Sequence, residues 1–436
     1  MSLYLMNEDI LSFVWRFQYF NTTNLQTDDN VSVSILRTGY KNANAGPDFS
    51  QAAVIIDNVH WHGSIEIHVR SSDWFLHTHE KDLAYEGVIL HVVWENDRPI
   101  IRKDGTMIPT LSLKGLVNAA VLERYAMLQD VKEGIPCAGM FQEILDIHKY
   151  AMLDRVLMGR LDRKAGEVMH LFENNQNDWE KTAYQWLGRH FGFKLNDHAF
   201  LRLTQIAPWK IIQKHRVRLV QIEALLFGMA GLIPEDSDEN YVRLLRKEFL
   251  FLTTKYELTE KVMWAHEWKY AKLRPAGFPT VRLAQLAKLL SREGSLFLML
   301  TSAQSITDLQ EIFHGTQSEY WTEHYVFGKK SKNKVPAMGK DASALLVINV
   351  VVPLLVAFSK QRQQPELLDK AIYWLSQVPA ENNRITRDWA TLGMRVNTAA
   401  DSQALIEWYN NFCSTRKCLD CTVGGILVRT SSLLQD

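Results

Sequence analysis

The 436-residue chain has few cysteines, no excess of either charge and no long uninterrupted apolar run. Its four cysteines are too few for a disulfide scaffold, which favours a reducing compartment, and we expect a cytoplasmic protein. Its 49 basic residues balance 49 acidic ones, so no overall field would steer the chain onto nucleic acid; such binding requires local patches. The first residues lack a basic segment followed by an apolar run, so we expect no signal peptide.

The most apolar stretch extends from Ser343 to Phe358 and contains Asn349 and Pro353. Its 16 residues are too few to span a bilayer comfortably. We therefore expect a buried helix and no membrane association.

The pattern of apolar and polar residues changes near residue 135, which predicts an α+β protein with two domains. Residues 1–135 mix helical and strand patterns, and residues 136–436 have helical periodicity almost throughout. No signature recurs at a fixed period, so the second part is predicted to be an irregular all-α domain with a cysteine-containing C-terminal segment.

The first domain is predicted to have the element order α-β-β-β-α-β. The expected elements are a helix over 7–20, strands over 31–36, 49–56 and 64–70, a helix over 73–85, a strand over 88–94 and a hairpin over 100–113. In the second domain, helices are expected over 141–172, 179–191, 216–230, 238–256, 281–291, 341–359, 365–377 and 401–413.

Histidine is concentrated in one short segment. Six of the fourteen histidines lie between His60 and His91, a stretch of 32 residues. This cluster indicates a metal site or a proton-transfer centre, because imidazole is both a common metal ligand and a base near neutral pH. For any single histidine, a surface position or a satisfied core position is the alternative.

Alternation along the strand expected at 64–70 places Glu66, His68 and Arg70 on one face. Asp48, at the start of the preceding strand, can lie beside Glu66 on an antiparallel neighbour. Two carboxylates at that proximity repel each other unless a cation lies between them. Their oxygen ligands favour Mg²⁺ or Mn²⁺.

Pro47-Asp48, followed by Glu66-Ile67-His68 within the α-β-β-β-α-β order, resembles the core of the PD-(D/E)XK nuclease-like superfamily. The resemblance implies that Asp48, Glu66 and the Ile67 carbonyl bind a divalent metal. It also implies that His68 occupies the position of the family's usual lysine, which positions or activates the attacking water. Further residues could complete such a site, namely the acidic Glu8 on the first helix and, as replacements for the lysine charge, Arg70 or Lys81.

The whole chain also resembles a bacterial family known as domain-of-unknown-function family 2851. The similarity is carried by the segments 45–49, 66–74, 77–79, 88–93 and 222–228. This resemblance implies no activity.

The helix expected after the strand would place Asp73, His77 and Lys81 on one face at four-residue steps. His77 and His79 are candidates for substrate contact. Together with Asp82 or His91 they could instead hold zinc, and three protein ligands with a water would form a hydrolytic centre.

The cysteines form a separate pattern. Cys413, Cys418 and Cys421 give the spacing C-x4-C-x2-C, and Cys137 stands near the domain boundary. Four thiols could bind zinc or an iron–sulfur cluster if the C-terminus folds back to Cys137. Otherwise they are small buried hydrophobic residues.

The sequence thus predicts a divalent-metal-dependent phosphodiesterase that acts on DNA or RNA. A lysine-rich loop over 328–340 supplies Lys329 and Lys330 as candidate phosphate contacts; the simpler alternative is a solvated loop. The alternatives are a non-catalytic nucleic-acid-binding or scaffold protein on the same fold, and the zinc hydrolase.

Overall fold

The computed structural model describes residues 6–42, 44–258, 261–315 and 317–429. The first five residues, which belong to the segment expected not to be a leader, lie outside them. The chain forms two compact units. The first comprises Met1–Asp154, Arg387–Met394 and Ile406–Asp436, and the second comprises Arg155–Thr386 and Arg395–Leu405. Residue 135, where the sequence pattern changes, lies inside the first unit.

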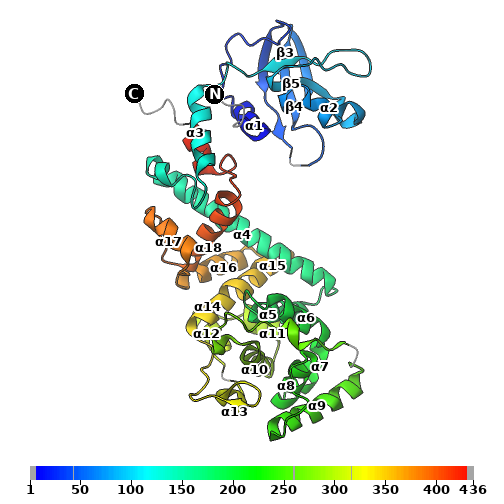
Figure 1. The fold of residues 1–436 in the computed structure, drawn as a ribbon, viewed down its shortest axis with the longest axis vertical. Helices are drawn as coiled ribbons and strands as arrows, with labels where there is room; N and C mark the ends of the chain where they lie inside the picture. The colour runs from blue at the N-terminus through cyan, green and yellow to red at the C-terminus, as the bar shows by residue number, and fades with distance from the viewer. Residues whose placement is uncertain (1–5, 43, 259–260, 316, 430–436) are drawn as a thin grey trace. The chain divides into compact units, whose positions relative to one another are not determined.

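The first unit contains a mixed sheet with the strand order β1-β3-β4-β5-β6 (Figure 1). Its strands are β1 (Val33–Arg37), β3 (Phe49–Ile56), β4 (Val59–Arg70), β5 (Val88–Glu95) and β6 (Thr110–Ser112), and the short β2 (Tyr40–Lys41) pairs with β3. β1, β3 and β4 are antiparallel neighbours, whereas β4, β5 and β6 run parallel. The coarse prediction of a mixed α/β N-terminal part and a largely helical remainder is confirmed.

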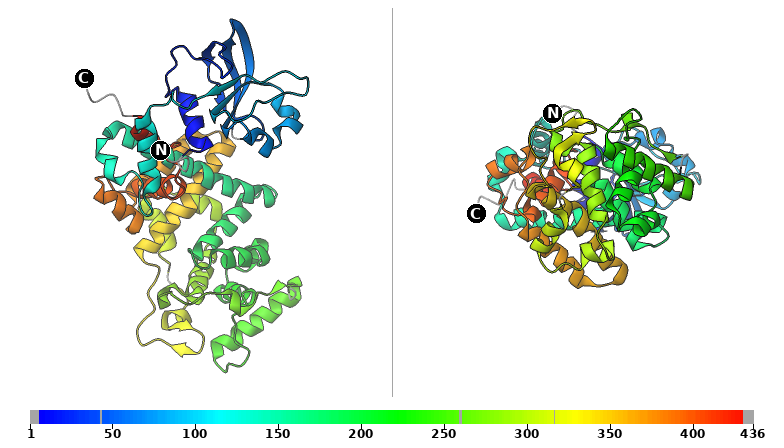
Figure 2. Two further views of the ribbon diagram at one scale, coloured as in Figure 1. Left: turned by 45° about the horizontal axis from the view of Figure 1, so that its top comes forward. Right: turned by 90° about the horizontal axis from the view of Figure 1, so that it is seen from below.

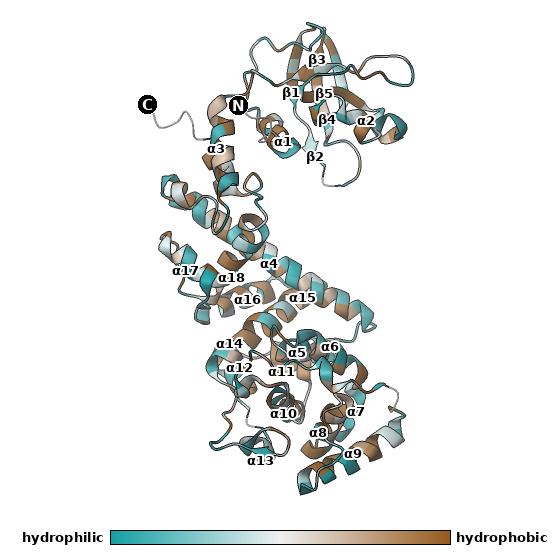
Figure 3. Ribbon diagram, in the orientation of Figure 1, coloured by the Kyte–Doolittle hydropathy of each residue, from teal (hydrophilic) through white to brown (hydrophobic). Residues whose placement is uncertain are grey.

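Burial explains the positions of these strands. The first six residues of β5 are all buried, as expected for a strand between two parallel neighbours, and Figure 3 shows its hydrophobic character. β4 is exposed at its first four residues and buried from Ile65 to His68. α1 (Glu8–Phe17) is capped by Asn7 and buries the side chains of Ile10 to Trp15, and Figures 1 and 2 show it beside the sheet.

The prediction of one helix over 73–85 is wrong. The segment forms α2 (Asp73–Leu76) and two 3-10 turns, η2 (His79–Lys81) and η3 (Leu83–Tyr85). The break falls at Thr78, whose φ of 59° is left-handed. The hairpin expected over 100–113 is reduced to a bridge between Ile101 and Met107, and β6 pairs in parallel with β5 instead.

The remainder of the first unit is helical. It contains α3 (Ala119–Asp130), η4 (Ala138–Glu143), η9 (Tyr409–Cys413), α19 (Thr422–Arg429) and parts of α4 (Asp146–Asn174), α17 (Arg384–Thr391) and α18 (Ala399–Trp408). The C-terminal segment packs on α3, where Arg124 donates to the Leu427 carbonyl over 3.3 Å. Phe141 contacts the buried rings of Trp389 and Trp408.

The second unit is a helical array around a large apolar core. Its helices are α5 (Trp179–Phe191), α6 (Asp197–Ile206), α7 (Trp209–His215), α8 (Leu219–Met229), α9 (Asn240–Tyr256), α10 (Pro279–Leu290), α11 (Leu296–Thr301), α12 (Ile306–Phe313), α13 (Glu319–Glu323) and α16 (Pro365–Gln377), besides the helix described next. The helices expected over 179–191 and 365–377 have the predicted bounds.

The apolar run at 343–358 lies in a longer helix than the sequence indicates. α14 (Lys340–Leu346), the π-helical η8 (Val347–Val351) and α15 (Val352–Arg362) join into 23 residues, long and apolar enough to cross a membrane by length and composition alone. Of its most apolar window, 72% is buried inside the protein. Its valines and leucines belong to the core of the second unit.

A buried carboxyl group in α8 gives this unit a pH-dependent stability. Burial raises the pKa of Glu223 to about 7, against the stabilising bond that its Oε2 accepts from the Tyr241 hydroxyl at 3.0 Å. Because the folded pKa lies above the unfolded one, Glu223 stabilises the fold below about pH 4.5, and this contribution is lost as the pH rises through about 7.

Glu223→Gln is therefore expected to raise the free energy of unfolding of the second unit at pH 8 by up to about 3 kcal/mol relative to the wild type. Below pH 4.5 the two proteins should be equally stable. Urea unfolding at several pH values measures the difference, and a difference that does not change with pH would contradict the assignment.

Candidate metal centre

The antiparallel pairing of β3 with β4 brings Asp48 next to Glu66. Phe49 pairs with Ile65, so the residues on either side of this pair meet across the two strands. The Asp48 N–H donates to Glu66 Oε2 at 3.1 Å, and the Ile67 N–H donates to Asp48 Oδ2 at 3.0 Å. The two predicted carboxylates are thus neighbours, and each is held by the backbone beside the other.

A third carboxylate reaches this place from α1. Burial raises the pKa of Glu8, while the charge of nearby His77 lowers it and that of Asp48 raises it. Glu8 also acts on the pKa of Glu66. The first helix therefore supplies an acidic side chain that interacts electrostatically with the pair, at the residue that the sequence analysis named.

The parallel pairing of β4 with β5 places Glu66 opposite His91. His68 Nδ1 lies 2.8 Å from His91 Nε2, and both rings are buried. This bond fixes the orientation of the His68 ring and directs its other nitrogen, Nε2, away from β5. A histidine that binds a metal commonly has its second nitrogen held in this way.

The break in the expected helix brings two more histidines to His68. With Thr78 left-handed, the chain reverses so that His77 and His79 both face β4. His68 Nε2 lies 3.1 Å from His77 Nδ1, and His79 Nε2 lies 3.2 Å from Glu66 Oε1. The His79 ring stacks on Tyr85 with centroids 3.7 Å apart, which holds it in place.

Three imidazoles converge at this point, and Glu66 lies beside two of them. One nitrogen from each of His68, His77 and His79 lies within 4.8 Å of the others, and Glu66 Oε1 is 3.6 Å from His68 Nε2. Donors bound at about 2.0–2.1 Å to one tetrahedral ion lie about 3.3–3.4 Å apart. The 3.1, 3.2 and 3.6 Å separations in this cluster are close to that value, so the three imidazoles fit a metal ion, with Glu66 beside His68 and His79 as a candidate fourth ligand.

The electrostatics of the cluster favour a cation. Burial, with the nearby Asp48 charge, raises the pKa of Glu66 to about 9. Burial lowers the pKa of His68 to about 2 and that of His91 to about 3, so both rings are neutral near pH 7. His79 Nε2 is buried, and although it lies 3.2 Å from Glu66 Oε1, it makes no hydrogen bond of suitable geometry among the described residues. Neutral imidazoles have free lone pairs, and a metal would compensate the buried carboxylate.

Two predicted residues of the first unit are exposed, and two others lie in the second unit. Arg70 and Lys81 are exposed; the Arg70 N–H donates to Asp73, and Lys81 pairs with Glu80 at 3.9 Å. Lys329 and Lys330 lie in the second unit, in β8 (Lys329–Lys330), which pairs with β7 (His324–Val326). There, the Lys330 amino group is 2.6 Å from Glu323.

The structure places a different cation near the carboxylates. Lys41 pairs with Phe49 through the two-residue strand β2, and its charge lowers the pKa of Asp48 against the raising effect of burial. Sequence reasoning missed Lys41 because a two-residue strand has no recognisable periodicity. The adjacency of the segment 40–41 to 49–50 follows only from tertiary pairing.

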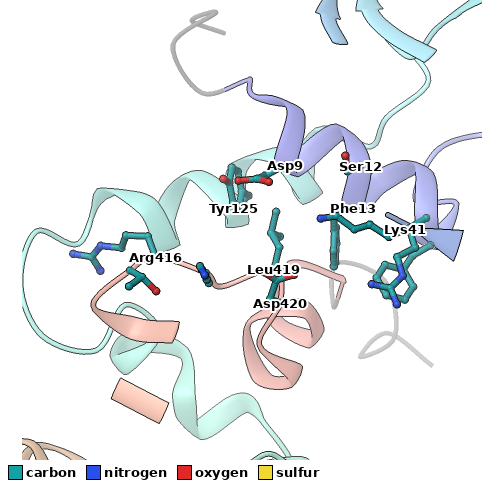
Figure 4. A pocket seen from close by; sticks show the side chains of 12 residues that line it. Asp9, Ser12, Phe13, Lys41, Tyr125, Arg416, Leu419 and Asp420 are labelled. Atoms are coloured by element: carbon teal, nitrogen blue, oxygen red, sulfur yellow. The ribbon is translucent and has the colours of Figure 1, made fainter. Parts of the chain in front are cut away.

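Lys41 also lines a cavity of about 220 Å³ beside α1 (Figure 4). Figure 4 shows side chains from α1, from α3 and from the C-terminal segment around it. The lining contains four basic residues, Arg16, Lys41, Arg416 and Lys417, and two acidic ones, Asp9 and Asp420. The basic cavity and the carboxylates therefore share Lys41 as a common neighbour.

Comparison with known proteins identifies the class to which the chain belongs. The chain belongs to the family described as protein of unknown function (DUF2851), which matches residues 8–384. No curated protein and no solved structure matches it. The matched range includes Glu8, Asp48 and the whole histidine cluster, and it ends before Cys413.

Proposed function

We propose that the protein is a divalent-metal-dependent phosphodiesterase that acts on nucleic acid, with the metal held by Glu66, His68, His77 and His79. The observation that carries the proposal is the convergence of the three histidine nitrogens, with Glu66 Oε1 at 3.2 Å from His79 and 3.6 Å from His68. Asp48 and Glu8 stand beside them as additional carboxylates.

The donor set bears on the identity of the metal. Mg²⁺ takes oxygen ligands and is rarely bound by imidazole, whereas zinc and similar transition ions accept imidazole nitrogen readily. Three histidines and one carboxylate therefore favour Zn²⁺ or Mn²⁺ over Mg²⁺. Relative to the expected pair of Asp48 and Glu66, the proposed centre keeps Glu66 as a ligand. Asp48 has a supporting role: its backbone N–H holds Glu66, and its carboxylate holds the Ile67 N–H between Glu66 and His68.

The order of elements supports the choice of reaction. α1 is followed by the antiparallel strands β1, β3 and β4, then by α2, and then by β5 parallel to β4. The nuclease-like core that the sequence resembles predicts such an order, with a four-residue α2 in place of the longer helix expected. Asp48, just before β3, and Glu66 on β4 are the residues at which the resemblance places the metal. His68, at the usual lysine position, is buried and neutral, so it suits a ligand rather than a phosphate-binding charge.

The basic cavity supports the choice of substrate. Lys41 lies at both the cavity and the carboxylates, and Arg416 has a buried nitrogen, Nη1, without a hydrogen-bond partner among the described residues. Arginine and lysine side chains in a cavity of this kind bind phosphate oxygens. A bound ion would act as a Lewis acid on the phosphodiester and on water. The protein itself orients the metal ligands and positions the basic side chains of the cavity.

The test is a cleavage assay with the purified full-length chain on single- and double-stranded DNA and RNA, with Mg²⁺, Mn²⁺ or Zn²⁺. Cleavage should require metal and stop on chelation. Asp48→Ala should reduce it about 10–100-fold, since it removes the carboxylate that accepts from the Ile67 N–H, between Glu66 and His68. Asp57→Asn, in the exposed turn between β3 and β4, is the matched control and should leave cleavage unchanged. Absence of cleavage and of metal binding under all conditions would refute the proposal.

A second substrate class is favoured by another cavity. About 250 Å³ of space adjoins His79 and is lined by Trp74, Phe75, Tyr85, Ile100 and Ile108 among others. Such an aromatic and aliphatic lining suits a small organic substrate. Hydrolysis of small esters or phosphate esters, with none of nucleic acid, would select this zinc-hydrolase alternative.

A further inference from the structure

The four cysteines all lie in the first unit, although Cys137 is far from the others in sequence. Cys137 precedes η4, Cys413 ends η9, and Cys418 and Cys421 lie in the turn before α19. Every one is buried, with 5–7% of its surface exposed, and none forms a disulfide. The entire cysteine content of the chain is therefore buried as free thiols in one unit.

Contacts around Arg416 bring the C-terminal segment to the chain that leads to Cys137. Arg416 donates to the Val131 carbonyl, and its own carbonyl accepts from Gln129 at 3.4 Å. Phe141, just after Cys137, contacts Trp408, which lies one helical turn before Cys413. The segment thus folds back onto the region of Cys137.

The thiols are close enough for their charges to interact. After burial, the causes that raise the pKa of Cys413 are Cys137, Cys421 and Cys418. Cys421 and Cys418 likewise raise the pKa of Cys137. The Arg416 charge opposes these effects at Cys413 and Cys418. The four thiols therefore lie near one another, with the Arg416 side chain beside two of them. As thiolates they would repel one another.

The turn that carries Cys418 and Cys421 is tight. The Cys421 N–H donates to the Cys418 carbonyl at 3.3 Å, and the Gly425 N–H donates to the Cys421 carbonyl at 2.8 Å. A Cβ at Gly424 would lie 2.2 Å from the Cys418 carbonyl oxygen, so only glycine allows α19 to begin this close. The turn therefore directs two cysteines, spaced as in C-x2-C metal sites, to the start of a helix.

We propose that Cys137, Cys413, Cys418 and Cys421 are the four thiolate ligands of a metal centre. Zinc and iron–sulfur clusters are the groups that take four cysteines. The thiols of a single zinc ion lie about 3.8 Å apart. Among the described residues, three donor atoms lie within 4.8 Å of one another at the histidines but not at the cysteines. The thiols therefore stand farther apart than around a single zinc ion, which favours the larger iron–sulfur cluster.

The centre would hold one wall of the basic cavity. Thr415, Arg416, Lys417, Leu419 and Asp420 line that cavity, and all of them lie between Cys413 and Cys421. A metal at the cysteines would fix this loop and with it two of the four cavity cations. The importance of this wall for nucleic acid depends on the proposed function, but the metal centre itself does not.

The experiment is metal analysis of the full-length chain purified without oxygen, followed by the same analysis of Cys418→Ser and Cys137→Ser. We expect iron and acid-labile sulfide, with visible absorption that each substitution abolishes. About one zinc per chain, lost in the same variants, would equally establish a thiolate centre and would identify its metal. Ser414→Ala, an exposed residue of the same loop, is the control and should retain the metal.

Two further measurements separate this centre from the histidine site and from misfolding. His68→Ala should keep the metal at the cysteines, even if it abolishes hydrolysis. In the wild type, thiol reagents should react with the cysteines only after chelation or oxidation removes the metal. Wild-type protein without zinc, iron or sulfide, and with thiols that react equally before and after chelation, would overturn the proposal.

Discussion

Replacing Glu66 by glutamine is expected to lower metal-dependent hydrolysis by more than about 100-fold, beyond the loss caused by a residue that only positions a ligand. Glu66 Oε1 faces His79 Nε2 at 3.2 Å and His68 Nε2 at 3.6 Å, so this oxygen would contact the metal. Glutamine has the same shape, and its carbonyl can still accept from the Asp48 N–H. The substitution removes the charge and leaves the rest of the cluster in place.

Although Glu66→Gln should lower the rate of hydrolysis, it should not lower the stability of the metal-free protein. Because burial raises the pKa of Glu66 to about 9, the charged form is disfavoured in the metal-free cluster. A neutral glutamine removes that cost, so Glu66→Gln should be at least as stable as the wild type without metal. With metal present, the wild type should gain stability and the variant should not.

Calorimetric metal titration, initial rates and thermal unfolding with and without metal test these two expectations together. Glu86→Gln is the matched control, since Glu86 is exposed and pairs with Lys103 at 3.6 Å. If Glu66→Gln binds metal and hydrolyses substrate as the wild type does, Glu66 is not a ligand. If it unfolds without metal while the wild type stays folded, the role of Glu66 is structural.

Replacing Trp408 by alanine is expected to destabilise the first unit by about 3–5 kcal/mol. Trp408 is fully buried, its ring centroid is 4.5 Å from that of Trp389, and both rings contact Phe141. These contacts join the C-terminal segment to η4. Their loss should loosen the segment that carries Cys413, Cys418 and Cys421, so metal at the cysteines should also be released more easily.

Denaturant unfolding followed by circular dichroism measures this loss: the first unit should unfold at a lower denaturant concentration than in the wild type. The second unit should unfold as in the wild type, because none of these three rings belongs to it. Trp264→Ala is the control, since 69% of Trp264 is exposed, and it should change the stability by less than about 0.5 kcal/mol. Equal effects of the two substitutions would contradict the importance assigned to the Trp408 contacts.

Much of the secondary structure was predictable because local periodicity reflects burial. The strand expected over 49–56 and the helices expected over 179–191 and 365–377 have the predicted bounds. The two helices have apolar residues at helical period, and the strand contains a continuous apolar run over 52–56, so each could be placed against a core. Where the expectation failed, over 73–85, the helical period is present, but Thr78 is left-handed. The packing of His77, His79 and Tyr85 against β4 outweighs the local preference.

In the candidate site, too, some features were predictable from the sequence and others were not. The proximity of Asp48 and Glu66 followed from sequence, because a strand, a short turn and an antiparallel return allow few registers. The zinc alternative named His77 and His79 but joined them to Asp82 or His91. In the structure, Asp82 caps the turn before Ala84, and His91 holds the far side of His68. His68 and Glu66 complete the cluster instead, which required the reversal at Thr78.

By itself, the sequence determined the mixed α/β beginning, the helical remainder and the residue types able to hold a metal, because these follow from composition and from local periodicity. Only the tertiary structure decided which donors meet. The convergence of Glu66 with His68, His77 and His79, the position of Lys41 and the return of the C-terminal cysteines toward Cys137 all depend on strand pairing, on one left-handed residue and on buried aromatic contacts. Such long-range packing leaves no periodic signal in the chain, because each contact joins residues whose local sequences are unrelated.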